Sequence, residues 1–132
     1  NAKLRETNLE GANLTSADLT SADLTGAILT DADLRGDNLR GADLRHAYLF
    51  GANLRGADLA NANLANANLG ETNLEGANLE GANLEGADLT RANLSGANLA
   101  NANLRETNLW GANLSGVIGD EDDFQGALNV PP

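Results

Sequence analysis

The chain has 132 residues, of which 42% are hydrophobic but only 3% aromatic, and its formal net charge is −11. This length is typical of one domain, and apolar residues that are almost all Leu and Ala favour a repeat over an ordinary globular core. The acidic balance disfavours direct binding to nucleic acid, and the lack of Cys excludes disulfides and thiolate metal sites.

No apolar run approaches the roughly 20 residues that cross a membrane. We therefore expect a soluble protein without a membrane span. The sequence identifies no compartment, although we favour the cytoplasm slightly over the periplasm or a lumen.

A five-residue repeat begins at the first residues and fills most of the chain. Leu occupies every fifth position from Leu4 to Leu114, usually with Ala two residues earlier and with Asn or Asp between them. A period of five fits neither a helix nor a strand alone, but it fits three extended residues followed by a tight turn. Ala and Leu then point inward and Asn or Asp points outward. This strict register argues against disorder, which an acidic, Gly-rich composition would otherwise favour.

The last position of each pentad predicts the turn. Thirteen of the fifteen glycines occupy it, and Asn occupies it three times. In a four-residue turn that begins at Leu, this residue is the third, and Gly or Asn there is typical of a type II turn with a positive φ. Ser16, Glu71 and Arg91 suit that conformation poorly, so we expect a looser turn at those corners.

If each turn bends the chain by about a right angle, four pentads close a square coil of twenty residues. Coils then stack one strand spacing apart, roughly 4.8 Å, and their backbone groups pair with one another. Each buried Leu contributes about 1.5–3 kcal/mol. Since a single coil buries little, stability requires several stacked coils.

The unit Ala-(Asn/Asp)-Leu-x-x resembles the motif of the pentapeptide-repeat family over about residues 2–116. The regularity is similar to that of its cyanobacterial members. The resemblance implies an all-β fold, a right-handed quadrilateral parallel β-helix, here of about six coils. Its handedness follows from the resemblance, because the period does not give it. We expect this solenoid domain to span residues 1–117.

The repeat degrades towards the C-terminus, where Gly119 replaces the expected Leu. Asp120 and the acidic residues that follow it resemble a helix start. We expect residues 118–132 to form a helical or irregular C-terminal capping segment in which Phe124 and Leu128 cover the last coil. No comparable cap precedes the first coil, which we expect to present an open end.

The sequence predicts no enzyme. The single histidine, His46, lies in a turn position, and no Ser-His-Asp or Cys-His set can form. Asp23 and Asp43 would place two carboxylates on neighbouring coils, but Ca²⁺ takes six or more oxygens, and Asn continues this column. We expect a solvent-facing Asn/Asp ladder, no bound metal and no cofactor.

Apolar residues in outward positions form a candidate partner surface. They all fall on the second of the four faces, and exposed apolar clusters often mark interaction sites. Incidental stacking along the face is an equally supported alternative. The candidate residues are Ile28, Tyr48, Phe50 and Trp110.

Charged residues form a basic belt around the second and third coils and an acidic belt further along. With Arg55 expected directly below Glu75, we interpret the belts as a solvated, salt-bridged surface in which each pair contributes little. The candidate basic belt comprises Arg35, Arg40, Arg45 and Arg55, and the acidic belt comprises Glu71, Glu75, Glu80 and Glu85.

These observations favour a non-catalytic scaffold that binds an unknown protein or only stabilises itself. Because exposed strand edges template association, we also expect a homodimer or end-to-end packing through Ala2, Leu4 and Leu9. The family resemblance implies an alternative, since some acidic members mimic DNA and bind DNA gyrase. The basic belt and the many outward Asn residues make this mimicry the less favoured function.

Asp37 stands where the motif has an inward Ala. A buried carboxylate costs several kcal/mol unless it is neutral or well hydrogen-bonded. Asp37 either accepts backbone N–H groups at the corner beside Gly36 and stays charged, or loses its charge because desolvation raises its pKa. We favour the first interpretation.

Overall fold

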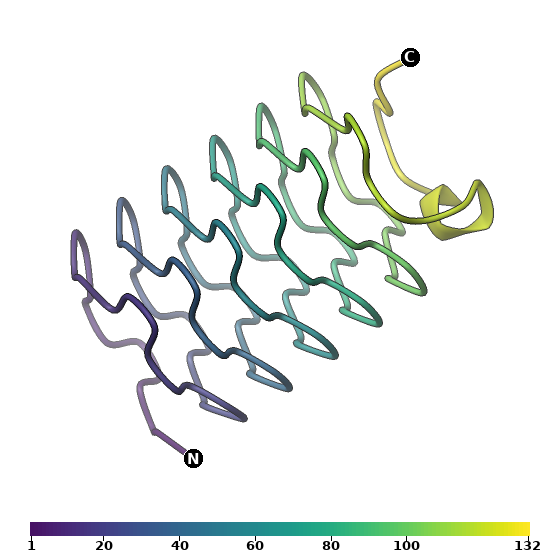
Figure 1. Cartoon of the computed structure of the whole chain (residues 1–132). Coiled ribbons are helices and arrows are strands. Elements are labelled where there is room, and N and C mark those ends of the chain that lie inside the picture. The colour runs from purple at the N-terminus through teal and green to yellow at the C-terminus, as the bar shows by residue number, and fades with distance from the viewer.

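The computed structural model describes all 132 residues and shows one rod of stacked coils that advances from the N-terminus to the C-terminus (Figure 1). From Lys3↔Asp23 to Asn108↔Leu128, each outward middle residue except Asn103 forms a parallel bridge with the residue twenty positions later. This spacing confirms the predicted coil of twenty residues. The right hand of the coil and the count of six coils stay predictions.

The bridges involve single residues, so the rod contains no continuous strand. The one helical element is the 3₁₀ helix η1, Asp122–Phe124. No helix in the structure has both the length and the apolar character needed to cross a membrane.

Backbone hydrogen bonds join each coil to the next through three groups of each pentad. The N–H of Leu24 donates to the carbonyl of Asp43 at 2.7 Å, and the N–H of Asp43 donates back to the carbonyl of Ala22 at 2.9 Å. The corner N–H of Gly26 donates to the carbonyl of Arg45 at 2.9 Å. The same pattern recurs along the rod, which satisfies backbone groups that face the neighbouring coils.

Every corner from residue 6 to residue 116 has a positive φ, between 54 and 70°. The expectation of a looser turn at Ser16, Glu71 and Arg91 is wrong, because their φ values are 56, 55 and 56°. At all three corners the N–H of the next residue donates to the carbonyl of the Leu three positions before it, at 3.0–3.2 Å. The corner N–H also donates to the next coil at 2.8–2.9 Å, so the ladder imposes the left-handed conformation on residues that disfavour it.

The leucines form the core as predicted. Every fifth Leu from Leu19 to Leu109 is at most 7% exposed. Leu4, Leu9 and Leu14, and Leu114 at the other end, are partly buried and pack against this core. The inward Ala residues fill the space between the leucine columns.

The C-terminal segment continues the ladder and then closes it. The N–H of Ile118 donates to the carbonyl of Ala97 at 2.8 Å, and the N–H of Glu106 donates to the carbonyl of Gly126 at 2.8 Å. These coil-to-coil hydrogen bonds continue beyond residue 117. The structure therefore does not mark a domain boundary there, and the boundary stays a prediction. Phe124 packs partly buried against the core.

Leu128 does not cover the last coil, contrary to the sequence-based expectation. It is 49% exposed and pairs with Asn108. The chain has returned to the repeat register at this point, so residue 128 occupies an outward middle position and Ala127 the inward one.

Candidate partner-binding surface

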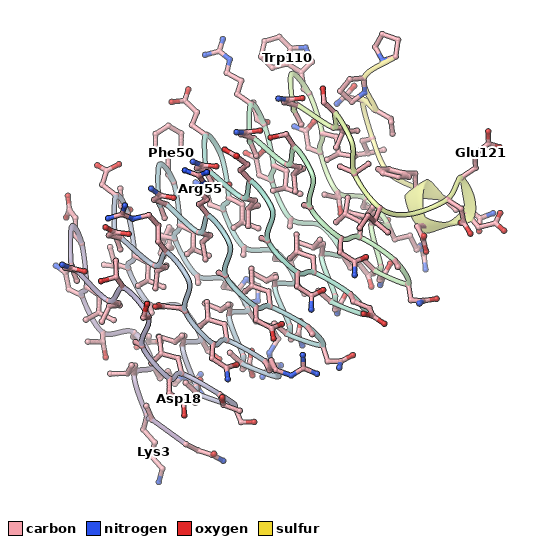
Figure 2. All side chains as sticks on the ribbon, in the orientation of Figure 1. Lys3, Asp18, Phe50, Arg55, Trp110 and Glu121 are labelled. Atoms are coloured by element: carbon pink, nitrogen blue, oxygen red, sulfur yellow. The ribbon has the colours of Figure 1, made fainter.

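Large apolar side chains are exposed in two regions of the rod. Phe50 and Trp110 project from it at well-separated levels (Figure 2). Tyr48 is 54%, Phe50 43% and Trp110 53% exposed. Ile118, Leu128 and Val130 are the other large exposed apolar residues, and all three lie towards the C-terminus.

Ile28, Tyr48 and Phe50 form one group, which we call the aromatic cluster. Ile28 and Tyr48 are bridged partners on adjacent coils, and Ile28 is half-buried. Phe50 follows two residues after Tyr48 and leans towards the next coil, where its ring lies over Gly70. The cluster therefore extends over three successive coils of the second face.

Gly70 is a positioning residue that the sequence analysis missed. A Cβ at Gly70 would lie 3.0 Å from Cδ2 and 3.3 Å from Cε2 of Phe50, and Gly70 does not have the positive φ of the corner glycines. Its missing side chain thus lets the ring lie against the coil. The signal in the sequence was a Gly outside the turn position, twenty residues after an aromatic residue.

The structure does not bring Trp110 to the aromatic cluster. Trp110 lies on the same face as Phe50 but three coils further on, and Gly70 and Thr90 occupy the positions between them. The guanidinium of Arg91 lies 5.2 Å from the centre of the Trp110 ring and 3.5 Å from a carboxylate oxygen of Glu71. The four predicted partner residues therefore divide into the aromatic cluster and a separate cation–π pair.

Each arginine of the basic belt lies beside a carboxylate. Arg35 and Arg45 pair with an Asp two residues earlier, and hydrogen bonds from these arginines lower the pKa of Asp33 and of Asp43. Such exposed pairs contribute little to stability. The basic belt thus offers no row of free cations, and the predicted pairing of Arg55 with Glu75 is confirmed. The pairs are Arg35–Asp33 at 2.6 Å, Arg45–Asp43 at 2.6 Å, Arg40–Asp58 at 3.0 Å and Arg55–Glu75 at 3.5 Å.

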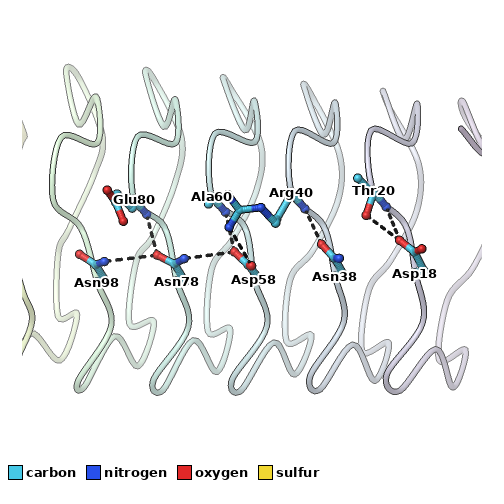
Figure 3. Close-up of polar contacts among 9 residues, drawn as sticks. All are labelled: Asp18, Thr20, Asn38, Arg40, Asp58, Ala60, Asn78, Glu80 and Asn98. Atoms are coloured by element: carbon cyan, nitrogen blue, oxygen red, sulfur yellow. Dashed lines mark hydrogen bonds and ion pairs between the residues drawn. The ribbon is translucent and has the colours of Figure 1, made fainter.

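Side chains within an outward Asn/Asp column bond to one another from coil to coil (Figure 3). The amide Nδ2 of Asn78 donates to Asp58 Oδ1 at 3.2 Å, and Nδ2 of Asn98 donates to Asn78 Oδ1 at 3.3 Å. Asn78 Oδ1 also accepts the N–H of Glu80 at 3.1 Å. The Oδ1 atoms of Asp58 and Asn78 therefore each serve both the turn and the neighbouring coil, which makes this column a structural ladder.

Hydrogen bonds and an ion pair already engage three of the four carboxylate oxygens of Asp23 and Asp43. Asp23 and Asp43 are bridged partners, but Arg45 engages both carboxylate oxygens of Asp43. A hydrogen bond from Thr25 lowers the pKa of Asp23. No group of three or more His, Asp or Glu side chains is arranged to hold a metal ion. His46 stands exposed at a corner.

Asp37 is fully buried and only half satisfied. Its Oδ1 accepts the N–H of Ala17 at 2.8 Å, and its Oδ2 has no hydrogen-bond partner. Desolvation raises the pKa of Asp37 to about 6, and the bond from Ala17 opposes this rise only in part. The hydrogen-bond donor therefore lies on the preceding coil and not at the corner beside Gly36, contrary to the interpretation that we favoured. The raised pKa agrees with the alternative, in which desolvation favours the neutral carboxyl group.

The buried hydroxyl groups at other inward positions are satisfied, in contrast to Asp37. Thr72 Oγ1 donates to the carbonyl of Leu69 and Thr107 Oγ1 to the carbonyl of Leu84, each at 2.7 Å. A hydroxyl can thus replace an inward Ala without leaving an unpaired polar atom.

The sequence profile of the pentapeptide repeats matches nearly the whole chain, over residues 1–36, 27–64, 57–96, 82–118 and 97–127. No curated protein matches the sequence.

Several solved structures are similar to the chain. HetL, a pentapeptide repeat protein involved in heterocyst differentiation regulation in the cyanobacterium Nostoc sp. strain PCC 7120, is 39% identical over 89% of this chain, with a TM-score of 0.40. The chain spans 61% of the length of HetL. A pentapeptide repeat protein of the Arabidopsis thaliana thylakoid lumen is 35% identical, with a TM-score of 0.59, over 80% of this chain and 70% of its own. Another Nostoc member is 34% identical, with a TM-score of 0.56, over 77% of this chain and 78% of its own.

Proposed function

Because the chain belongs to the pentapeptide-repeat family, we propose that it is a non-catalytic scaffold that binds another protein through the aromatic cluster. The proposed scaffold is a right-handed quadrilateral rod of about six coils. The observation that carries the proposal is the exposure of Tyr48 and Phe50, at 54% and 43%, on a rod whose other outward positions over the first coils are polar. Aromatic residues are enriched in the buried centres of protein interfaces.

The backbone of the cluster and the ring of Phe50 make contacts before any partner binds. The N–H and the carbonyl of Tyr48 bond to Ala27 and Leu29 on the preceding coil, and the ring of Phe50 rests on Gly70 of the following coil. Side chains that are already held in place lose less conformational entropy on binding, so more of their contact energy contributes to affinity.

Charge indicates the chemistry of the partner. Asp31 and Glu71 occupy the corner positions one coil before and one coil after the corner beside Phe50, and Asp31 forms no ion pair. With a net charge of −11 on the whole chain, a partner with an apolar anchor and Lys or Arg at its rim complements this surface best.

The first experiment uses Tyr48→Ser/Phe50→Ser in affinity capture from an extract of the source organism. We expect loss of a captured protein, which would then be purified and its affinity measured. Removing two interface aromatics at about 2 kcal/mol each would weaken binding by about a thousandfold if the two losses add. Trp110→Ser is the matched control on the same face, and it should bind the purified partner as the unmodified protein does.

Other outcomes would replace the proposal. Equal affinity of the double variant for every captured partner would show that the cluster is incidental. A different outcome is that the double variant binds captured proteins normally but shows a lower molecular mass than the unmodified protein in sedimentation. That result would mean that the cluster joins two copies of the chain into a homodimer.

DNA-gyrase mimicry is the second candidate function, and net acidity is the observation that favours it. The paired arginines argue against a continuous phosphate-like surface, since they neutralise carboxylates around the second and third coils. We expect the protein to leave gyrase-catalysed DNA supercoiling unchanged. Inhibition that survives Tyr48→Ser/Phe50→Ser would favour mimicry over the scaffold.

A further inference from the structure

Asp37 occupies a place in the core that the scaffold function does not explain. It replaces Ala in an inward column in which Ala17 precedes it by one coil and Ala57 follows it by one coil. Its side chain is 0% exposed, and Oδ2 is the buried side-chain atom that lacks any hydrogen-bond partner. A carboxylate in this position is strongly disfavoured unless it takes up a proton.

The carboxyl group of Asp37 also connects two coils. The N–H of Ala17 donates both to the carbonyl of Leu14, at 3.0 Å, and to Asp37 Oδ1, at 2.8 Å. Ladder bonds surround this contact, because the N–H of Leu19 donates to the carbonyl of Asn38 at 2.8 Å and the N–H of Asn38 donates to the carbonyl of Ala17 at 2.9 Å. Ionisation of the buried Asp37 carboxyl group therefore also destabilises the contact between these two coils.

No cation offsets the charge of Asp37. Asp33 lies near enough for its negative charge to raise the pKa of Asp37 further. The nearby arginines, Arg35 and Arg40, point outward and pair with Asp33 and Asp58. The outward acid one coil before, Asp18, is held by Thr20 and adds no positive charge. Only a proton can neutralise the buried group.

We propose that Asp37 makes the junction between the coils of Ala17 and Asp37 sensitive to pH, closed when the carboxyl group is protonated and loosened when it is ionised. Opening would release the carboxylate into water, where it ionises without penalty. The junction then opens and closes as a local unit, while the remainder of the rod stays folded.

The direction with pH follows from the two states. In the closed state the pKa of Asp37 is about 6, above its ordinary value of 3.8, so the closed state binds more protons than the open one. The stability of the junction is therefore fully present below the ordinary pKa and declines as the pH rises to the closed-state pKa. Between pH 5 and pH 7.5 the open population should increase about tenfold.

Amide hydrogen exchange tests this proposal on the full chain. After correction for the intrinsic exchange rates, the protection of the Leu19 and Asn38 amides should fall about tenfold from pH 5 to pH 7.5. The amides of Leu79 and Leu84 belong to distant coils, and their protection should not follow this titration. Equal protection of Leu19 and Asn38 at the two pH values would overturn the proposal.

Two variants assign the effect to Asp37. Asp37→Ala restores the repeat motif and should abolish the pH dependence at Leu19 and Asn38, as should the near-isosteric Asp37→Asn. The control Asp33→Asn removes an outward acid, and it should retain most of the dependence. Persistence of the full tenfold change in both Asp37 variants would assign the titration to another group.

A direct titration keeps the proposal testable if either variant folds poorly. The ¹³Cγ chemical shift of Asp37 in the unmodified protein should titrate with a midpoint near 6. A midpoint near the ordinary value of 3.8 would overturn the proposal.

Discussion

At the scale of single residues, the corner position sets a conformation that its side chain often disfavours. Ser21 has a φ of 54°, and its N–H donates to the carbonyl of Arg40 at 2.9 Å. Left-handed geometry costs a residue with a Cβ about 1–2 kcal/mol, and a Gly avoids that cost. The stacked ladder must therefore supply this energy at each corner that lacks Gly.

We expect Ser21→Gly to stabilise the protein by about 0.5–1 kcal/mol, since relief of the left-handed strain exceeds the entropy gained by the unfolded chain. Ser95→Gly is the matched control, because Ser95 precedes the corner and has no positive φ. There the same substitution should destabilise the protein by about 0.5–1 kcal/mol. Urea denaturation of both variants measures the two changes, and a destabilised Ser21→Gly would contradict the strain argument.

Gly70 allows a second test at this scale. In Gly70→Ala the new Cβ would lie 3.0 Å from the Phe50 ring, so the ring must shift by a few tenths of an ångström. We expect a coupling free energy of about 0.5–1.5 kcal/mol between positions 50 and 70 in a double-mutant cycle with Phe50→Ala. Additive changes in the free energy of unfolding would show that the ring does not depend on Gly70.

At the scale of elements, η1 closes the ladder with a side chain. Asp123 Oδ1 accepts the N–H of Asn101 at 2.8 Å, and Oδ2 accepts the N–H of Asp120 at 2.9 Å. Asp123→Ala should therefore destabilise the protein by about 1–2 kcal/mol and increase hydrogen exchange at Asn101. Asp122→Ala, in the same helix but without such a bond, should have little effect. Equal losses in the two variants would show that local charge matters more than this closure.

The sequence predicted the repeating element well and its exceptions less well. The strict spacing of Leu from Leu4 to Leu114 was enough to predict the period of the coil and the residues of its core. Side-chain direction alternates along the three extended residues of each pentad, and this alternation decides which side chains point inward. The conformation of Glu71 and Arg91 was mispredicted because local propensity ignores the neighbouring coils. The role of Gly70 depends on the tilt of one ring, and the partner of Asp37 Oδ1 lies twenty residues away, so neither follows from local spacing.

At the scale of the whole molecule, each coil contacts only its neighbours, so the cost of a core cavity should depend on its place along the rod. Leu64 is 0% exposed between two full coils, whereas Leu4 is partly buried. We expect Leu64→Ala to cost about 2.7–5 kcal/mol, the range of fully buried Leu deletions, and Leu4→Ala to cost roughly half as much or less. The free energy of unfolding in urea gives both values, and exchange should show that Leu4→Ala loosens only the amides of the first coil. Similar costs at the two positions would mean that the rod unfolds as one unit whose stability is shared evenly. In that case a pH effect at the Ala17–Asp37 junction would spread along the whole solenoid instead of opening one interface.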